Sequence, residues 1–492
     1  MSQIDSLPPY DLAISETNLH VSPAPYNAVP PPSFTDIIPT YRIGSWTLDS
    51  PLVSVQQLKA HLTLLRAFKN LRLTVEGEGS RLPLACSVPL RGAQRWAWFV
   101  NLAVERFQRW AAAVQVKDLH HWLAEELPPL DVLMVWHAYM LNPTWYAEDC
   151  ERLPLLRLLR VMRDKLLPAV MRMGDNPAYQ PSEAREDSWL AQTDTPFDPL
   201  DAAACMFSRT IECPECCTSI EPPYLNQEGT GYAQHNFKQK CSKCEHEITK
   251  ASLGTAKFVK DLMTDRSQTS AAKVYLAGTL HTPTNAKDTG RATRFKNGLL
   301  RLRQFQQYGL SKEGWKREIQ HQLRHSMKTL IVSAYTDDRP FSVDLVGAVL
   351  RQGIFIDKMH EFGWTRPGFF DNREDEHVLE HAIARYHAFL DLMATSEEPL
   401  MLVPTLDIDL AWHSHQLKAG QYELDCKQYV GRYIDHDDKV AQDYLASSLD
   451  TTCRAWQKRY GVPYMYCGCP LPEESISERL RRFKHSMKEK PL

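Results

Sequence analysis

The chain has 492 residues, of which 43% are hydrophobic and 24% are charged, and its formal net charge is −3. This length and apolar content suffice for two to four domains with cores of their own, and the nearly neutral charge argues against a general attraction to nucleic acid or membranes. No apolar run of about 18 residues is present, so we expect no membrane partner. The first residues lack the features of a secretory leader, and we therefore expect a cytoplasmic or nuclear protein whose 12 cysteines are thiols or metal ligands.

The first third of the chain is predicted to be a disordered lead followed by helices. Residues 1–40 hold eight prolines and few apolar anchors, which is typical of an extended, disordered segment. Residues 41–185 predict a first helical repeat, because apolar residues recur there every three or four positions. Within this repeat, Leu155–Leu167 predicts a helix that Pro168 should kink or end.

Residues 186–255 predict a small β-rich insert with a metal site. The insert contains two C-x-x-C pairs, whose members are Cys213, Cys216, Cys241 and Cys244. A tight turn within each pair lets both sulfurs reach one ion, and four thiolates can surround Zn²⁺ tetrahedrally. A module this small has too little core to fold alone, so the metal would supply its folding free energy. We therefore predict a zinc ribbon with a structural Zn²⁺, although Cys217 could substitute as a ligand. Four unrelated buried cysteines, or an unmetallated redox pair, are the alternative.

The segment that follows the insert is basic. Residues 256–327 predict a helical connector, and the stretch 287–328 holds eleven Lys or Arg against three Asp or Glu, with four aromatic residues between them. Basic and aromatic residues beside a zinc ribbon are compatible with nucleic-acid contact. The simpler interpretation, which we favour, is a solvated helix face that balances acidic surface elsewhere.

Residues 328–470 predict a second helical repeat, and residues 471–492 predict a charged tail. The strongest helix of this part is Glu376–Met393, whose apolar residues share one face. Its central residues, which begin at Arg385, echo the segment that begins at Arg106 in the first repeat. The repeated unit therefore includes the helix before the signature described next.

A 23-residue signature occurs twice, from Pro128 to Cys150 and from Pro404 to Cys426, with nine identical positions. The shared residues that we single out are Asp131/Asp407, Trp136/Trp412, His137/His413, Asp149/Asp425 and Cys150/Cys426. A match of these residue types in one window predicts an internal duplication. The predicted fold class is accordingly mainly α, a duplicated helical repeat domain with an inserted zinc ribbon.

The signature supports a structural and a functional interpretation. In the structural one, which we favour, the shared Trp and His lie in the core, and Asp149 or Asp425 accepts a hydrogen bond from the His. In the functional one, Asp409, His413 and His415 of the second copy build a 2-His-1-carboxylate metal centre. On a helix, however, His413 and His415 point about 200° apart, so only Asp409 and His413 could share an ion and a third ligand must come from elsewhere.

The block PTLDIDLAWHSHQL, at Pro404–Leu417, and the later Trp456–Gly461 resemble the glycine-rich domain-containing protein-like family of plants and fungi. This resemblance covers roughly residues 40 to 470 and implies no established activity. A 2-oxoglutarate-dependent dioxygenase label, which some fungal relatives carry, would require an H-x-D triplet and a distant His on a β-barrel. The H-x-D triplet here begins at His436 and lies in a polar turn of a mostly helical region.

We interpret the chain as an intracellular zinc-binding protein that acts as a binding or scaffold module with a protein partner. The duplication favours this interpretation over an enzyme, because the shared residues are of the packing type. A non-haem metal enzyme built on Asp409, His413 and His415 is the first alternative. Nucleic-acid binding through the ribbon and the basic stretch is the second.

Overall fold

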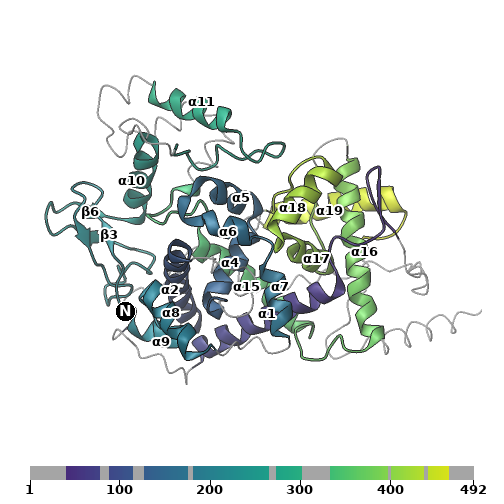
Figure 1. Cartoon of the computed structure of the whole chain (residues 1–492), viewed down its shortest axis with the longest axis horizontal. Helices are drawn as coiled ribbons and strands as arrows, with labels where there is room; N and C mark the ends of the chain where they lie inside the picture. The colour runs from purple at the N-terminus through teal and green to yellow at the C-terminus, as the bar shows by residue number, and fades with distance from the viewer. Residues whose placement is uncertain are drawn as a thin grey trace, which may run out of the picture.

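The computed structural model describes residues 40–77, 88–114, 127–174, 181–264, 273–301, 333–396, 401–436 and 442–464. Within these ranges the protein is mainly helical, as predicted (Figure 1). None of the described helices is both long and apolar enough to cross a membrane. The predicted lead up to residue 39 and the charged tail at 471–492 lie outside the described residues.

The described residues up to 205, which span the first predicted repeat and the start of the predicted insert, begin with a small antiparallel hairpin and continue as helices. Its elements are β1 (Tyr41–Ile43), β2 (Trp46–Leu48), α1 (Val55–Glu76), α2 (Gly92–Ala113), α4 (Leu130–Met140), α5 (Pro143–Arg152), η1 (Pro154–Leu156), α6 (Arg157–Met162), α7 (Leu166–Met173), α8 (Glu183–Thr193) and α9 (Pro199–Cys205). Ser54 and Gln57 form a capping box at the start of α1, which fixes where this helix begins.

The helix predicted over Leu155–Leu167 is not continuous. It is divided into η1, α6 and the start of α7, and Pro168 lies in the first turn of α7 rather than beyond a helix end. Proline is tolerated there because the first N–H groups of a helix have no partner within the helix. The apolar spacing correctly predicted which side chains are buried, since Leu159, Met162 and Leu166 are fully buried. It did not predict where the helix is interrupted.

The insert and the second half follow. Their elements are β3 (Ile211–Glu212), β4 (Ser219–Ile220), β5 (Gln239–Lys240), β6 (Glu247–Ile248), α10 (Lys250–Met263), α11 (Thr289–Leu300), α15 (Leu345–Glu361), α16 (Arg373–Thr395), α17 (Leu406–Gln416), α18 (Ala419–Asp425), the π-helical turn η3 (Cys426–Val430) and α19 (Gln442–Tyr460). The helix predicted at Glu376–Met393 is α16, whose side-chain cap is Asn372.

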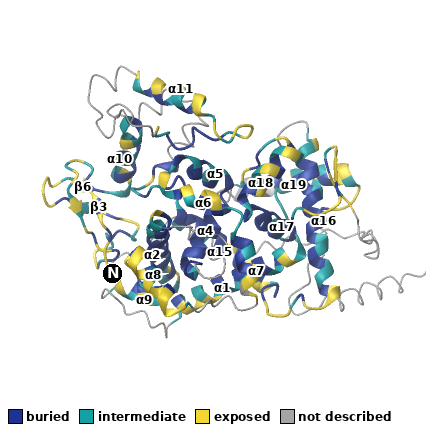
Figure 2. Cartoon of the chain, viewed as in Figure 1, coloured by how far each residue is buried: buried dark blue, intermediate teal, exposed yellow. Residues whose placement is uncertain are grey.

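The two halves pack closely and exchange elements. Figure 1 shows α1, α2, α4 and α15 near the centre, α16 to α19 on one side, and α10 with the β3–β6 hairpins on the other. Helix α15 belongs to the second half by sequence, yet it packs against α4, α1 and α2. Conversely, β1 of the first half packs against α16. Figure 2 shows that α4 and α17, which carry the two signatures, are buried almost throughout.

Candidate metal centres and the paired signature

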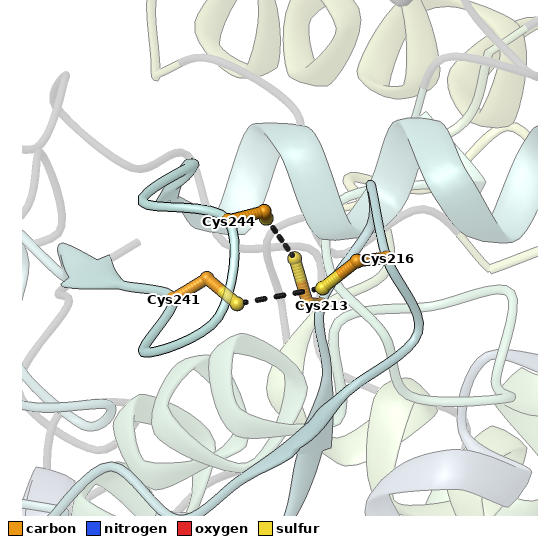
Figure 3. Close-up of side chains that lie close together, drawn as sticks. All are labelled: Cys213, Cys216, Cys241 and Cys244. Carbon is orange, nitrogen blue, oxygen red and sulfur yellow. Dashed lines mark hydrogen bonds between the residues drawn. The ribbon is translucent and has the colours of Figure 1, made fainter.

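The four cysteines of the two C-x-x-C pairs lie together. Cys213 Sγ is 3.6 Å from Cys244 Sγ, and Cys216 Sγ is 3.5 Å from Cys241 Sγ. All four sulfurs lie within 4.8 Å of one another, and Figure 3 shows the side chains converging. Four sulfurs at these separations match the ligand set of a tetrahedral zinc site. The residues present therefore fit the metal that the spacing predicts.

The two cysteine pairs lie in hairpins of the same construction. In the first, which is β3–β4, the N–H of Cys213 donates to Thr218 O; in the second, β5–β6, the N–H of Cys241 donates to His246 O. The fifth residue of each turn, Cys217 or Glu245, has a positive φ, of 56° and 57° respectively. Such matching backbone turns bring both sulfurs of each pair to the same side. Cys217 is exposed and lies outside the four-sulfur group.

Backbone and hydroxyl groups around the sulfurs favour thiolates. Contacts with Thr218 lower the pKa of Cys216 to about 6. The backbone N–H groups of Cys244 and Lys243 lower the pKa of Cys241. Because the thiolate is the form that binds a metal, these contacts prepare one cysteine of each pair for Zn²⁺. The N–H of His246 lowers the pKa of Cys244, but desolvation and the neighbouring sulfurs outweigh it and raise this pKa to about 12.

The paired signatures make the same two contacts inside each half. Trp136 Nε1–H donates to Tyr146 Oη at 3.0 Å, and Trp412 Nε1–H donates to Tyr422 Oη at 2.9 Å. A buried ion pair then joins each signature helix to the helix before it. These pairs are Arg106 Nη1 with Asp131 Oδ2 at 2.9 Å and Arg385 Nε with Asp407 Oδ2 at 2.7 Å. These arginine partners were not identified from the sequence, although the echo between the segments that begin at Arg106 and Arg385 already aligned them.

The prediction that Asp149 or Asp425 accepts a hydrogen bond from the shared histidine is wrong. Asp149 accepts a hydrogen bond from Tyr139, and Asp425 Oδ2 lies 3.0 Å from His415 Nε2. Both partners lie two residues after the shared histidine, a position that turns toward the following helix. Cys150 and Cys426 are buried, and burial raises the pKa of Cys426 to about 12, so it behaves as an inert core thiol.

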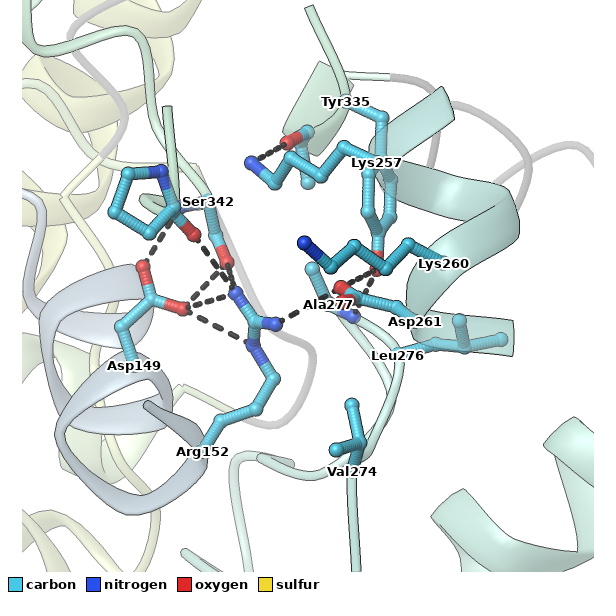
Figure 4. Close-up of polar contacts among 12 residues, drawn as sticks. Asp149, Arg152, Lys257, Lys260, Asp261, Val274, Leu276, Ala277, Tyr335 and Ser342 are labelled. Carbon is cyan, nitrogen blue, oxygen red and sulfur yellow. Dashed lines mark hydrogen bonds and ion pairs between the residues drawn. The ribbon is translucent and has the colours of Figure 1, made fainter. Parts of the chain in front are cut away.

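Asp149 also anchors the segment that connects the two halves. Its carboxylate accepts hydrogen bonds from the backbone N–H and the hydroxyl of Ser342, and it pairs with Arg152 at 3.0 Å (Figure 4). Arg152 extends to Asp261 of α10, which also accepts a hydrogen bond from Tyr335. The first signature is thereby tied to the connector and to the start of the second half.

His137 of the first signature is a satisfied core residue. Its Nε2 lies 2.9 Å from Nε2 of His61, whose Nδ1 lies 2.9 Å from Ser414 Oγ. The Ser414 hydroxyl donates to Leu410 O, so it accepts a hydrogen bond from Nδ1–H of His61. Nε2 of His61 is then unprotonated and accepts, and Nε2 of His137 carries the proton that it donates to His61. Burial lowers the pKa of His137 to about 3, so the ring is neutral at pH 7.

His413 of the second signature lies in a different environment. Its Nε2 is 3.2 Å from Asp409 Oδ1 and 3.0 Å from Nε2 of His436. Burial alone would raise the pKa of Asp409. The nearby His413 and His436 rings outweigh this effect and lower the pKa, because they stabilise the carboxylate. Of the three residues that the functional interpretation joined, the structure brings together Asp409 and His413, while His415 turns to Asp425 and Tyr386.

The third member of this group, His436, was not selected from the sequence. The only signal was its place in the H-x-D triplet, which we weighed for a different fold. On α16, His377, Glu380 and His381 spell H-x-x-E-H, a pattern found in some zinc proteases, but they are not among the metal-type clusters of the described residues. Most of the basic stretch 287–328 lies outside the described residues, and nucleic-acid binding through it stays a prediction.

Comparison with known proteins finds a family match for part of the chain. Residues 296–425, which include most of the second signature, match the family model described as glycine-rich domain-containing protein-like. Glycine-rich domain-containing protein 2 of Arabidopsis thaliana is 37% identical over 132 residues, which cover 25% of this chain and 16% of that protein. Glycine-rich domain-containing protein 1 of the same plant is 32% identical over 132 residues, or 25% of this chain and 15% of that protein.

The match thus spans less than a fifth of the length of these curated relatives. No solved structure shows significant similarity to the chain. The comparisons confirm the resemblance to the glycine-rich domain-containing protein-like family for residues 296–425, while its wider span over residues 40 to 470 stays a prediction.

Proposed function

We propose that the protein is an intracellular binding or scaffold module whose β-rich insert is a zinc ribbon. The observation that carries this proposal is the convergence of four cysteine sulfurs from two hairpins of identical construction. Four thiolates leave no coordination position open, so the ion has a structural role and supplies folding free energy to the insert. All nine cysteines among the described residues are free, which agrees with a reducing compartment such as cytoplasm or nucleus.

The insert is held firmly on the helical body, as a scaffold requires. Tyr232 donates to Asp338 Oδ1 at 2.7 Å, and Arg209 Nη2 pairs with Asp338 Oδ2 at 2.8 Å. Arg209 also pairs with Glu105 of α2. We propose that the protein partner of this module binds the helical body and the insert together, because these ion pairs hold the two as one unit.

We propose further that the helical body is an internal duplication. The matching Trp–Tyr hydrogen bonds and Arg–Asp ion pairs of the two signatures support this proposal, because each contact joins equivalent elements. The shared Trp and the Asp at the start of each signature helix make the same contacts in both copies. This agrees with a structural role for the repeats.

The zinc assignment is tested by metal content. The full chain, Cys216→Ser and Cys217→Ser would be purified in parallel, and zinc per chain measured by mass spectrometry. We expect Cys216→Ser to lose one equivalent, because three thiolates hold Zn²⁺ less tightly than four. Cys217→Ser is the matched control and should retain that equivalent. Equal zinc in both variants would contradict the ribbon.

A further inference from the structure

We propose that Asp409, His413 and His436 bind a second divalent transition-metal ion, at the contact between the two halves. Imidazole and carboxylate together suit ions such as Zn²⁺ and Fe²⁺. The site is independent of the four cysteines, which lie in the insert. It also differs from the set expected from sequence, because His436 takes the place of His415.

The distances between the three ligand atoms fit one ion. His413 Nε2 lies 3.0 Å from His436 Nε2 and 3.2 Å from Asp409 Oδ1, and the third separation is 3.7 Å. In a tetrahedral site with metal–ligand bonds of about 2.05 Å, neighbouring ligand atoms lie about 3.3 Å apart. The three separations bracket that value. Asp409 and His413 come from successive turns of α17, so one helix supplies two of the ligands.

The orientation of His436 prepares its lone pair for a metal. Its Nδ1 lies 3.1 Å from the carbonyl oxygen of Leu141, and a carbonyl can only accept. The proton is therefore on Nδ1, and the Nε2 lone pair faces His413 and Asp409. Metal-binding histidines commonly donate their other N–H to a carbonyl in this way. Two acceptors, His436 Nε2 and Asp409 Oδ1, then face the same atom, His413 Nε2. A cation bound between these three atoms would accept a lone pair from each of them.

The equivalent position of the first half lacks these ligands. His137 donates a hydrogen bond to His61, so no lone pair of that nitrogen is available for a metal. Residue 133, which aligns with Asp409, is Leu. The proposed metal site is therefore confined to the second half, where the signature supplies Asp409 and His413 and the loop after it supplies His436.

The proposed site differs from the cysteine site in being open. Three protein ligands leave at least one coordination position for water or a small ligand. The side chains of Asp409 and His436 are 17% and 12% exposed, so the site lies near the surface, although Asp409 Oδ1 is itself buried. Because His436 is fixed by a carbonyl of the first half, a bound ion also joins the two halves.

The test is metal binding by the full chain and four variants. The protein would be stripped with a chelator and loaded with Zn²⁺, or with Fe²⁺ under anaerobic conditions, before total metal per chain is measured. We expect two equivalents in the wild type, one of which is lost in Asp409→Asn and in His436→Gln. His415→Gln is the control, because the His415 ring lies on α17 but contacts Asp425 and Tyr386 rather than the proposed ion, and it should keep both.

Cobalt separates this site from the cysteines. Co²⁺ bound by thiolates gives intense charge-transfer absorption, which Asp409→Asn should leave unchanged while Cys216→Ser weakens it. Added Zn²⁺ should raise the melting temperature of the wild type more than that of Asp409→Asn. A wild type that binds one equivalent, at the thiolates alone, would overturn the second site and leave the ribbon intact. So would a His415→Gln variant that loses as much metal as Asp409→Asn.

Discussion

At the scale of single residues, the buried ion pairs distinguish the signature from an ordinary apolar helix. Arg106 and Asp131 are each 1% exposed, and burial lowers the pKa of the arginine and raises that of the aspartate. Desolvation thus opposes the charged form of both partners, so the pair adds little net stability. The pair instead specifies how the two helices pack, because any arrangement that separated them would leave one charge buried without its partner.

We therefore predict that Asp407→Asn destabilises the protein by about 3–5 kcal/mol, because it leaves the Arg385 charge in the core. Asp131→Asn should cost a similar amount through Arg106. Urea denaturation followed by circular dichroism measures both. Asp49→Asn, at an exposed position, is the control and should stay within about 0.5 kcal/mol of wild type. A small effect of Asp407→Asn would mean that water reaches Arg385.

At the scale of elements, Glu148 joins α5 to the segment before α11. Its two carboxylate oxygens accept hydrogen bonds from the backbone N–H groups of Gly278 and His281. The side chain is nonetheless almost fully buried, and burial raises the pKa of Glu148 to about 7, against an ordinary value of 4.5. This contact should therefore depend on pH.

The folded chain holds the Glu148 proton up to about pH 7, whereas the unfolded chain releases it near pH 4.5. Stability from this carboxyl is therefore complete below pH 4.5 and is lost as the pH rises through 7, a change of about 3 kcal/mol. We predict that Glu148→Gln removes this contribution from the slope of unfolding free energy between pH 4.5 and 8. Glu183→Gln, on an exposed face, should leave the slope unchanged. Equal slopes in wild type and Glu148→Gln would contradict the raised pKa.

Elements differ in how well the sequence predicted them. Helices α1, α2 and α16 were predictable because apolar spacing reports which face is buried, and the cysteine pairs because their turns are local. The helix interruptions on either side of α6 could not be predicted, since they depend on how short helices pack against their neighbours. His436 was missed for a similar reason: the loop that carries it is placed beside α17 by tertiary packing. Periodicity shows that a face is buried but not what covers it.

At the scale of the whole molecule, the halves are interlocked. Gly44 N–H donates to Asp391 Oδ1 of α16 at 2.8 Å, and Lys418 Nζ donates to Leu52 O at 2.6 Å. In the opposite direction, Asp357 of α15 pairs with Lys69 of α1 at 2.6 Å. One apolar cluster of buried residues runs through both halves, while a smaller one lies around α10 and α11.

Interlocked halves should unfold together, because neither keeps its core when the other opens. Leu410 is fully buried in α17, and Leu410→Ala should cost about 2–5 kcal/mol. We predict that this substitution speeds hydrogen exchange of the α4 amides as much as that of the α17 amides, since both exchange through the same global opening. Leu424→Ala, at a position 59% exposed, is the control and should change neither. Continued protection of α4 while α17 exchanges would show that each half is a separate folding unit, and that the elements they exchange hold them together only loosely.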